Sequence, residues 1–287
     1  KKPFFVWLNT SRMHVFTHAP TRYTERCKQF TSGDDPHCAG MLQHDENVGT
    51  VLKKLDDLGI SDNTVVIYSS DNGPEHSTWP FGATTPYRGE KMTGWEGAVR
   101  VPMLLRWPGK IAPGTDLNEM QSHEDVFTTL SAIGGIPDVR ERLSKGDALG
   151  TGVTKKNFID GLNNLDYWTG KSEKSARDSL IIYGESRPMA VRVGPWKAHF
   201  SVRDGYYGNT KSLELAWLFN IRQDPFESFD QAPGPRATNA QSHTYTEYMV
   251  MELMAAHLKS LTDFPPAQKG SSLSFDQMLE AVPKGKQ

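Results

Sequence analysis

The spacing of apolar residues along the chain predicts its helices and strands. The run "TVVIYSS" (64–70) is β-branched and almost continuously apolar, which is typical of a strand covered on both faces of a parallel sheet. The run "PFFVWLNTS" (3–11) predicts another buried strand. Between them, "AGMLQHDENVGTVLKKLDDLG" (39–59) has apolar residues at three- and four-residue steps and ends in glycine, so it predicts a helix. Strand, helix and strand thus follow in the order of a crossover unit.

Two further segments extend this α/β layer. The apolar run "VPMLLRW" (101–107) predicts a third strand, which "PGKIAPG" ends. The segment "HEDVFTTLSAIGG" (123–135) has helical spacing, with Val126, Leu130 and Ile133 on one face.

The rhythm changes in the second half of the chain. From about residue 137 to 179 the composition turns polar and glycine-bearing, as in a boundary or a long surface connection. Four short apolar runs follow (180–185, 189–194, 196–202 and 215–221) and predict a small antiparallel sheet. A helix predicted over 245–261 is expected to cover that sheet with one side, which carries Tyr248, Met251, Leu253, Met254 and Leu258.

These elements predict an α/β fold class: part of a large, mostly parallel sheet flanked by helices, followed by a small antiparallel four-stranded sheet with a C-terminal helix. The expected domains are residues 1–140, a connecting segment 141–178, and a small α+β subdomain 179–287. The first predicted strand begins two residues from the start of the chain. We therefore expect further polypeptide to precede Lys1.

Composition and charge exclude two classes of partner. Lys and Arg number 32 against 34 Asp and Glu, so no broad basic field would attract nucleic acid. No apolar run approaches the roughly 20 residues of a membrane span, and the first residues lack the features of a signal peptide.

The two cysteines, Cys27 and Cys38, lie in a loop-like stretch. A disulfide between them would suit an oxidising compartment, and two reduced thiols explain the count almost as well. His37 and His44 lie near the cysteines, but the spacing fits no zinc pattern.

Several polar residues are expected at one edge of the predicted sheet. Asp71 and Asn72 follow the strand 64–70 at its carboxyl end, where α/β sheets bind ligands, although Asp-Asn-Gly is also ordinary turn chemistry. His14 and His18 follow the first strand, and Lys91 lies in a glycine-flanked loop. A carboxylate and an amide can hold a divalent cation, a lysine an anion, and a histidine can protonate a leaving oxygen. Together this set suits hydrolysis of a sulfate or phosphate ester.

Longer motifs carry a family resemblance. The segments "PFFVWLNTSRMH", "HDENVGTVLKKLDDLGISDNTVVIYSSDNGPE", "RGEKMTGWEGAVRVPMLLRWPGKI" and "SHEDVFTTL" occur in the order and spacing of the type I sulfatases, the arylsulfatase family of the alkaline phosphatase superfamily. The pieces "IDGLNNLDYWTGK", "MAVRVGPWKAHF" and "LFNIRQDPFE" resemble the carboxyl-terminal part of bacterial arylsulfatases. The resemblance covers nearly the whole chain, and "SDNG" and "GEKMTGWEGAVRVP" are its most specific elements.

The resemblance implies roles for particular residues. Asp71 and Asn72 match a pair of ligands for calcium (Ca2+) or another divalent cation. Lys91 matches the lysine that binds the sulfate, and His14 matches the histidine that contacts the sulfate and assists the leaving group.

Other residues of these loops have less defined roles. His18 and His76 are expected to contact substrate or to be exposed loop histidines. Trp79 and Arg88 lie in similar loops that border the substrate in such enzymes. Glu96 and Arg100 lie in the "WEGAVR" block, where a structural ion pair is expected.

The chain also departs from the family pattern. The family's nucleophile is a formylglycine made from the Cys or Ser of a Cys/Ser-X-Pro/Ala-X-Arg motif, and neither "RCKQF" nor "HCAGM" fits it. The paired aspartates that complete the calcium site are absent as well, so both features are expected upstream of Lys1. Residues 1–140 then correspond to the second half of a sulfatase catalytic domain, and the chain is expected to be inactive without its missing N-terminal part.

The resemblance implies a sulfuric ester hydrolase acting on a small-molecule or glycan sulfate ester, in a periplasmic, secreted or lysosomal setting. Two alternatives remain open. One is a phosphatase or phosphonate hydrolase of the same superfamily, since the same residues would serve a phosphoester. The other is a non-catalytic fragment or binding module that keeps the fold.

Overall fold

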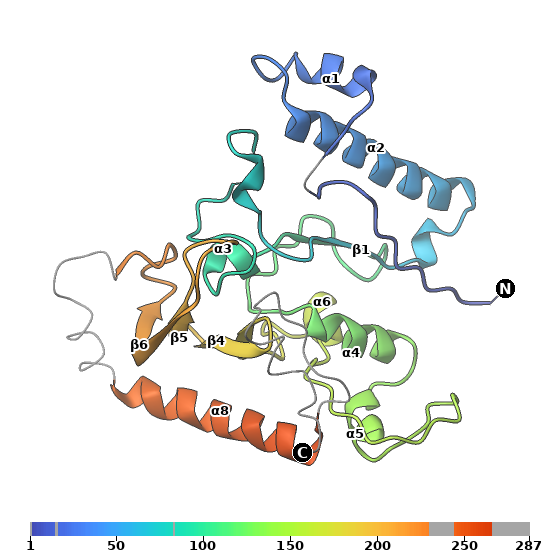
Figure 1. Ribbon diagram of the computed structural model, residues 1–287. Coiled ribbons are helices and arrows are strands. Elements are labelled where there is room, and N and C mark those ends of the chain that lie inside the picture. Colours follow the sequence, from blue (N-terminus) through green and yellow to red (C-terminus); the bar gives the residue numbers. More distant parts are fainter. Residues whose placement is uncertain (1, 15–16, 83, 230–243, 266–287) are drawn as a thin grey trace, which may run out of the picture. The chain divides into compact units, whose positions relative to one another are not determined.

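The computed structural model describes residues 2–14, 17–82, 84–229 and 244–265. The chain forms two compact units, the first made of residues 1–86 and 100–109 and the second of residues 87–99 and 110–287 (Figure 1). The domain boundaries at residues 140 and 178 stay a prediction, and residues 266–287 of the predicted subdomain lie outside the described part. No helix of the described part is long and apolar enough to cross a membrane.

The first unit is built around one long helix. Its elements are α1 (Thr21–Cys27), α2 (Pro36–Asp57), η1 (Ser61–Asn63), β1 (Val66–Ser69), η2 (His76–Thr78) and β2 (Met103–Arg106). Helix α2 confirms the predicted helix, and the Asp35 side chain caps its start by accepting a hydrogen bond from the Cys38 N–H at 2.9 Å. Gly59, with φ +64°, follows its end, where a left-handed residue commonly stops a helix.

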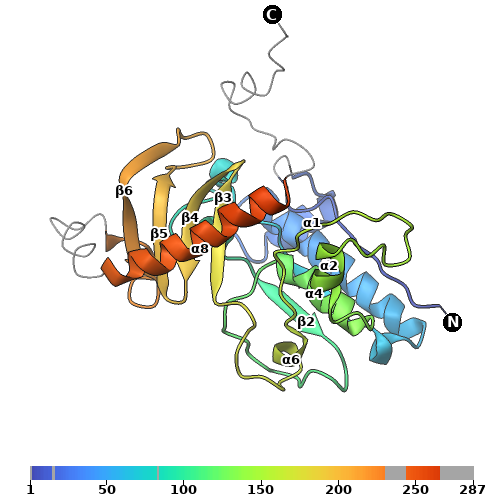
Figure 2. The ribbon, with the colours of Figure 1, turned by 90° about the horizontal axis from the view of Figure 1, so that it is seen from below.

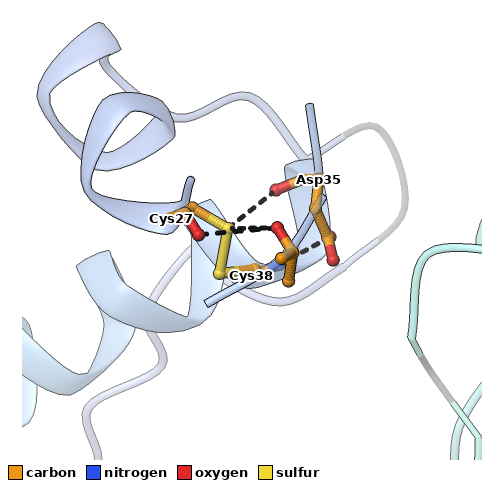
Figure 3. The surroundings of a disulfide bond; sticks show 4 residues. Cys27, Asp35 and Cys38 are labelled. Carbon is orange, nitrogen blue, oxygen red and sulfur yellow. Dashed lines mark hydrogen bonds between the residues drawn. A yellow bond between two sulfur atoms is a disulfide. The ribbon is translucent and has the colours of Figure 1, made fainter. Parts of the chain in front are cut away.

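A disulfide joins the two helices of this unit. Cys27, at the end of α1, is bonded to Cys38 in the first turn of α2 (Figure 3). The sequence left both a disulfide and two free thiols open, and the structure decides for the disulfide. Cys27 is buried and packs with Tyr23 and Ala39, so the bond lies in a small apolar core between α1 and α2.

The strands of the first unit differ from the prediction. Strand β1 pairs with β2 in antiparallel register, from Val66 opposite Arg106 to Ser69 opposite Met103, and its residues are half-buried. Residues 3–10 form no strand, so the strand predicted over 3–11 is wrong. The side chains of Phe4, Phe5, Val6, Trp7 and Leu8 are all more than half exposed. A strand needs a neighbour to pair its backbone groups, and no described strand pairs with this segment.

Four helices of the second unit precede its sheet in the described part of the chain. They are α3 (Glu96–Val99), α4 (Glu124–Ile133), α5 (Val139–Ser144) and α6 (Leu165–Trp168), and both α5 and α6 contact α4. Helix α4 confirms the predicted helix 123–135, but its most buried residues are Asp125, Thr128 and Thr129 instead of the apolar face. Asp125 and Thr129 form hydrogen bonds with Leu162 and Asn164, whereas Thr128 Oγ1 has no hydrogen-bond partner among the described residues.

The four predicted strands of the second unit are confirmed. Strands β3 (Ser179–Gly184), β4 (Arg187–Val193), β5 (Trp196–Val202) and β6 (Lys211–Asn220) form an antiparallel sheet in that order. Together with the helices of both units, this sheet confirms the α/β class and the small four-stranded sheet with its C-terminal helix.

Helix α8 (Thr244–Asp263) lies across one face of this sheet (Figure 2). Its buried Val250 packs with Val191 and Ala198 of the sheet, and Leu253 and Met254 join the same cluster. The other three residues predicted to face the sheet are exposed: Tyr248, Met251 and Leu258. The apolar residues of α8 thus lie on two sides of the helix. Val250, Leu253 and Met254, spaced three and four residues apart, form the side that packs on the sheet.

Candidate functional site

The loop after β1 combines turn geometry with unused oxygen atoms. One oxygen of the Asp71 carboxylate accepts the Asn72 N–H at 2.9 Å, and the Asn72 amide donates to the Gly73 carbonyl at 2.9 Å. Ser70 Oγ donates to the Asn72 carbonyl at 3.1 Å. Within the described part, no hydrogen bond reaches the second Asp71 oxygen or Asn72 Oδ1. The turn and the pair of cation ligands are therefore compatible, because they use different atoms.

The three predicted histidines of the first unit are all exposed. His14 accepts a hydrogen bond from Thr17 Oγ1 at 2.6 Å through its backbone carbonyl, His18 precedes α1, and His76 begins η2. Among the described residues, no group of three or more His, Cys, Asp or Glu is arranged to hold a metal. The structure thus brings Asp71 and Asn72 together as neighbours and adds no third acidic, histidine or cysteine ligand from the described residues.

Lys91 lies in the second unit, in residues 88–96, here called the Lys91 loop. Thr93 Oγ1 closes the loop by donating to the Glu90 carbonyl at 2.7 Å, and Lys91 Nζ lies 5.9 Å from the centre of the Tyr206 ring. Gly89 has φ +84°, and a Cβ there would lie 2.6 Å from Thr93 Oγ1. Only glycine fits this position, so Gly89 is a requirement of the loop.

A buried cluster of four charged or titratable residues anchors the end of the Lys91 loop. We call it the Glu227 cluster; its members are Glu96, Lys197, His199 and Glu227. Lys197 Nζ lies 3.0 Å from both Glu96 Oε1 and Glu227 Oε1. His199 Nε2 lies 2.7 Å from Glu227 Oε1, and the Glu96 N–H donates to Glu227 Oε2 at 2.6 Å. Glu96 thus forms a buried ion pair with Lys197, and the ion pair of Glu96 with Arg100 stays a prediction.

Burial and charge set the protonation states within the Glu227 cluster. Burial lowers the pKa of His199, against the hydrogen bond with Glu227, so the neutral imidazole is favoured. Burial works against ionisation of Glu227, but the contacts with His199 and the Lys197 ammonium outweigh it and lower the pKa of Glu227. A neutral His199 that donates through Nε2 leaves Nδ1 as an acceptor, and this buried atom has no partner among the described residues.

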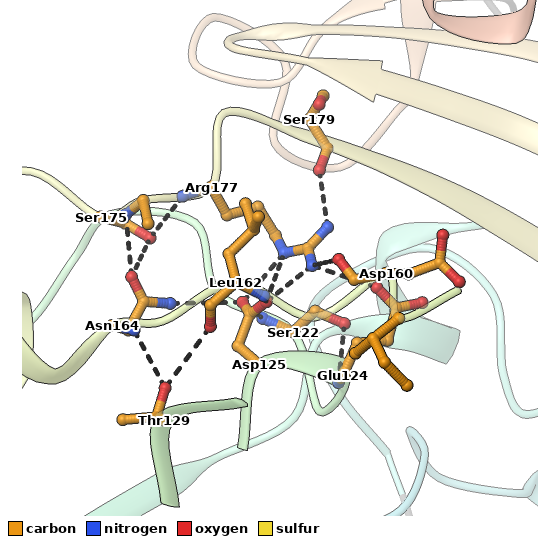
Figure 4. Close-up of polar contacts among 12 residues, drawn as sticks. Ser122, Glu124, Asp125, Thr129, Asp160, Leu162, Asn164, Ser175, Arg177 and Ser179 are labelled. Carbon is orange, nitrogen blue, oxygen red and sulfur yellow. Dashed lines mark hydrogen bonds and ion pairs between the residues drawn. The ribbon is translucent and has the colours of Figure 1, made fainter. Parts of the chain in front are cut away.

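A second buried network connects α4 to the segments before the sheet (Figure 4). The Arg177 guanidinium donates to both oxygens of Asp125, with Nη2–Oδ1 at 2.6 Å and Nε–Oδ2 at 2.9 Å. Three further donors reach this carboxylate: the N–H groups of Ser122 and Leu162 at 2.9 and 2.7 Å, and the Asn164 amide at 3.3 Å. The side chains of Asp125 and Arg177 are 2% and 7% exposed, so this network is part of the core.

The predicted site residues are divided between the two units. His14, His18, Asp71, Asn72 and His76 belong to the first unit, and Lys91 belongs to the second.

Comparisons with known proteins identify the family. The family model described as sulfatase matches residues 1–136, and the model described as the C-terminal region of aryl-sulfatase matches residues 175–285. The chain belongs to the type I sulfatase family. Among sulfatases, arylsulfatase A of Homo sapiens is 30% identical, over 93% of this chain and 51% of that protein. The N-acetylgalactosamine-6-sulfatase of Canis lupus familiaris is 28% identical, over 88% of this chain and 42% of that protein.

A solved sulfatase structure shares the fold. The crystal structure of the PsFucS1 sulfatase from Pseudoalteromonas sp. matches with a TM-score of 0.74 at 24% identity, over 91% of this chain and 49% of that one. This chain therefore spans about half the length of that sulfatase and of human arylsulfatase A.

The two buried networks of this sulfatase chain were not predicted from the sequence. One signal was available in "WKAHF", where Lys197 and His199 alternate with apolar residues and so share one face of β5. No comparable signal marks Asp125, since an acidic residue in the first turn of a helix is commonplace.

Proposed function

We propose that this chain is the second part of a sulfatase that hydrolyses sulfate esters to an alcohol or phenol and sulfate. Asp71 and Asn72 hold a divalent cation. Calcium is the proposed ion, because it binds carboxylate and amide oxygens. The observation that carries this assignment is the pair of unused oxygens on adjacent residues after β1, in a chain of the sulfatase family.

The other proposed roles follow from charge. The Lys91 ammonium binds the sulfate and draws charge from its oxygens, which is most effective in a site that excludes water. His14 donates a proton to the leaving oxygen, a role that suits an imidazole near neutral pH. His18 and His76 contact the alcohol or glycan part of the substrate. When bound, the cation adds positive charge at the sulfate oxygens.

An upstream part of the same polypeptide supplies the nucleophile, a formylglycine, and the remaining cation ligands. Two observations support this part of the proposal. The chain spans about half of human arylsulfatase A, and an apolar segment of five residues, Phe4 to Leu8, is exposed on the first unit. The chain without that part has no activity in this proposal. The Cys27–Cys38 disulfide supports an oxidising compartment, periplasmic, secreted or lysosomal.

The test uses the complete natural polypeptide and the 287-residue chain side by side, each assayed with an aryl sulfate, sulfated glycans and an aryl phosphate in the presence of calcium. We expect the complete protein to cleave a sulfate ester and the chain alone to cleave none. Lys91→Ala is expected to lower kcat/KM of the complete protein by about 100-fold or more, with the exposed Lys110→Ala as matched control.

The cation ligands are tested separately. Asp71→Asn is expected to weaken calcium binding by the complete protein, measured by calorimetry, whereas Asp62→Asn on the exposed η1 is expected to leave it unchanged. Faster turnover of the phosphate ester than of any sulfate ester would contradict the sulfatase assignment in favour of a phosphatase. If the complete protein hydrolysed neither ester, the remaining interpretation would be a non-catalytic binding module.

A further inference from the structure

The two ends of the Lys91 loop meet on a single residue of the C-terminal part of the second unit. We propose that Glu227 is a positioning residue, which holds the Lys91 loop in the shape that presents the Lys91 ammonium to an anion. The inference rests on the proposed function of Lys91 as the sulfate-binding lysine.

The side chain of Glu227 holds the end of the loop. Its Oε2 accepts the Glu96 N–H at 2.6 Å, at the point where the loop passes into α3. Its Oε1 lies 2.7 Å from His199 Nε2 and 3.0 Å from Lys197 Nζ, so two residues of β5 fix the carboxylate in turn. All these groups are buried, and hydrogen bonds among charged groups in such surroundings are short and directional.

The backbone of Glu227 holds the start of the loop. Arg88 Nη1 donates to the Glu227 carbonyl at 2.8 Å, and the guanidinium lies 3.7 Å from the centre of the Trp95 ring. His199 also packs against Trp95, with the two ring centres 4.3 Å apart. Arg88 and Glu96 therefore both form hydrogen bonds with Glu227, which lies 131 positions after Glu96 in the sequence.

The conformation of Glu227 is itself unusual. Its φ is +50°, in the left-handed region that favours glycine, although the residue is fully buried and carries a long side chain. Surrounding contacts must hold such a conformation, and strained residues of this kind concentrate at functional sites. Contacts to the Lys91 loop and to β5 hold it, together with a hydrogen bond from the Glu227 N–H to the Asp224 carbonyl at 3.2 Å.

A third tether lies next to Lys91. Glu90 Oε1 accepts the Tyr206 N–H at 3.0 Å, and Lys91 Nζ lies 5.9 Å from the Tyr206 ring. A Cβ at Gly205 would lie 2.7 Å from Glu90 Oε1, so the glycine permits this approach. Tyr206 thus fixes Glu90, and Glu227 fixes Arg88 and Glu96. The backbone between these residues, which includes Lys91, therefore has little conformational freedom. An ammonium on a loop fixed in this way loses less entropy when it binds an anion.

The test measures the affinity of Lys91 for inorganic sulfate in the complete natural polypeptide. The variant is Glu227→Gln, which keeps the size of the side chain and removes its charge. The probe is the ¹³Cε NMR signal of Lys91, assigned with Lys91→Arg and followed during titration with sodium sulfate. Hydrogen exchange of residues 88–96 is measured on the same samples.

Two control variants separate positioning from a general loss of stability. Glu214→Gln makes the same chemical change at an exposed position of β6. Val250→Ala destabilises the same unit by removing a buried contact between α8 and the sheet. We expect Glu227→Gln to weaken sulfate binding at least fivefold and to speed exchange in the Lys91 loop at least tenfold. Neither control is expected to do so.

Each outcome decides the inference. Unchanged sulfate affinity and unchanged exchange in Glu227→Gln overturn it, as does an equal loss of affinity in Val250→Ala. If the complete wild-type protein shows no sulfate response at Lys91, the proposed role of Lys91 fails, and loop exchange alone decides whether Glu227 positions the loop. If Glu227→Gln does not fold, Arg88→Met replaces it, because Arg88 is only half-buried and its loss frees the start of the loop.

Discussion

Arg177→Met removes one partner of the buried ion pair with Asp125 and keeps most of the apolar volume of the side chain. In the folded protein the guanidinium also donates to the carbonyl groups of Asp160 and Ser179, both at 3.1 Å. Loss of one partner from a buried pair typically costs about 3–5 kcal/mol, because the remaining charge stays buried without compensation. Asp125 would keep its three other hydrogen bonds, so we expect a loss near the lower limit, about 3 kcal/mol.

The reverse change is expected to cost more. Asp125→Ala leaves the buried Arg177 guanidinium with the partly exposed Glu124 carboxylate, at 3.2 Å, as its ion-pair partner. It also removes the acceptor for three other donors: the N–H groups of Ser122 and Leu162 and the Asn164 amide. We expect this variant to lose about 4–5 kcal/mol. The double variant Asp125→Leu/Arg177→Met should not regain stability, because the same three donors remain without an acceptor.

Urea unfolding followed by circular dichroism and tryptophan fluorescence measures these differences. The matched control is Lys171→Met, which removes an ion pair to Asp166 at 3.7 Å in the same unit, with both side chains 71% exposed. Such exposed pairs contribute at most about 1 kcal/mol. If Arg177→Met were no more destabilising than Lys171→Met, or if Asp125→Ala cost less than Arg177→Met, this account of the network would be refuted.

Three further predictions concern the disulfide, two glycines and pH. The Cys27–Cys38 bond joins residues 11 positions apart, and its reduction should lower the free energy of unfolding by about 3 kcal/mol. Urea titrations with and without reductant measure this difference. Gly161→Ala should destabilise by about 1–3 kcal/mol because its Cβ would overlap a backbone carbonyl of α4, whereas Gly49→Ala, in open space on α2, should stabilise by up to about 1 kcal/mol. Burial holds the pKa of His199 below its ordinary value of 6.5, so on acidification His199 is protonated in the unfolded chain before it is protonated in the folded chain. The free energy of unfolding should therefore fall by up to about 1.4 kcal/mol per pH unit below pH 6.5. His199→Gln should remove this dependence on pH.

The elements with strong periodicity were predictable from the sequence. Helices α2 and α4 and the strands β3 to β6 lie where apolar spacing and flanking glycines placed them. A continuous apolar run such as residues 3–8 shows only that its side chains favour burial. It does not show that a partner strand is present, nor whether the pairing of a strand such as β1 is parallel or antiparallel.

The candidate site was predictable only in part, for a different reason. Asp71, Asn72 and Lys91 lie in loops next to elements that the sequence reveals, so their places along the chain could be predicted. Buried polar partners come from distant positions, as with Glu96 and Glu227, and one sequence contains no record of which charges meet. The turn after β1 also shows why local chemistry left two interpretations open, since one Asp71 oxygen forms the turn and the other remains unused.

The block "RGEKMTGWEGAVR" carries two roles that stability measurements can separate. Arg88, Trp95 and Glu96 contact Glu227 or His199 in the core, whereas Lys91 lies outside the Glu227 cluster. Removal of one member of a buried polar network leaves its partners unpaired, so its loss costs more than the net contribution of one contact. Glu96→Gln should therefore lower the free energy of unfolding by about 3 kcal/mol, while Lys91→Arg should change it by less than about 0.5 kcal/mol. Equal losses in urea unfolding would mean that Lys91 is part of the same structural network, and its proposed role in binding sulfate would lose its physical basis.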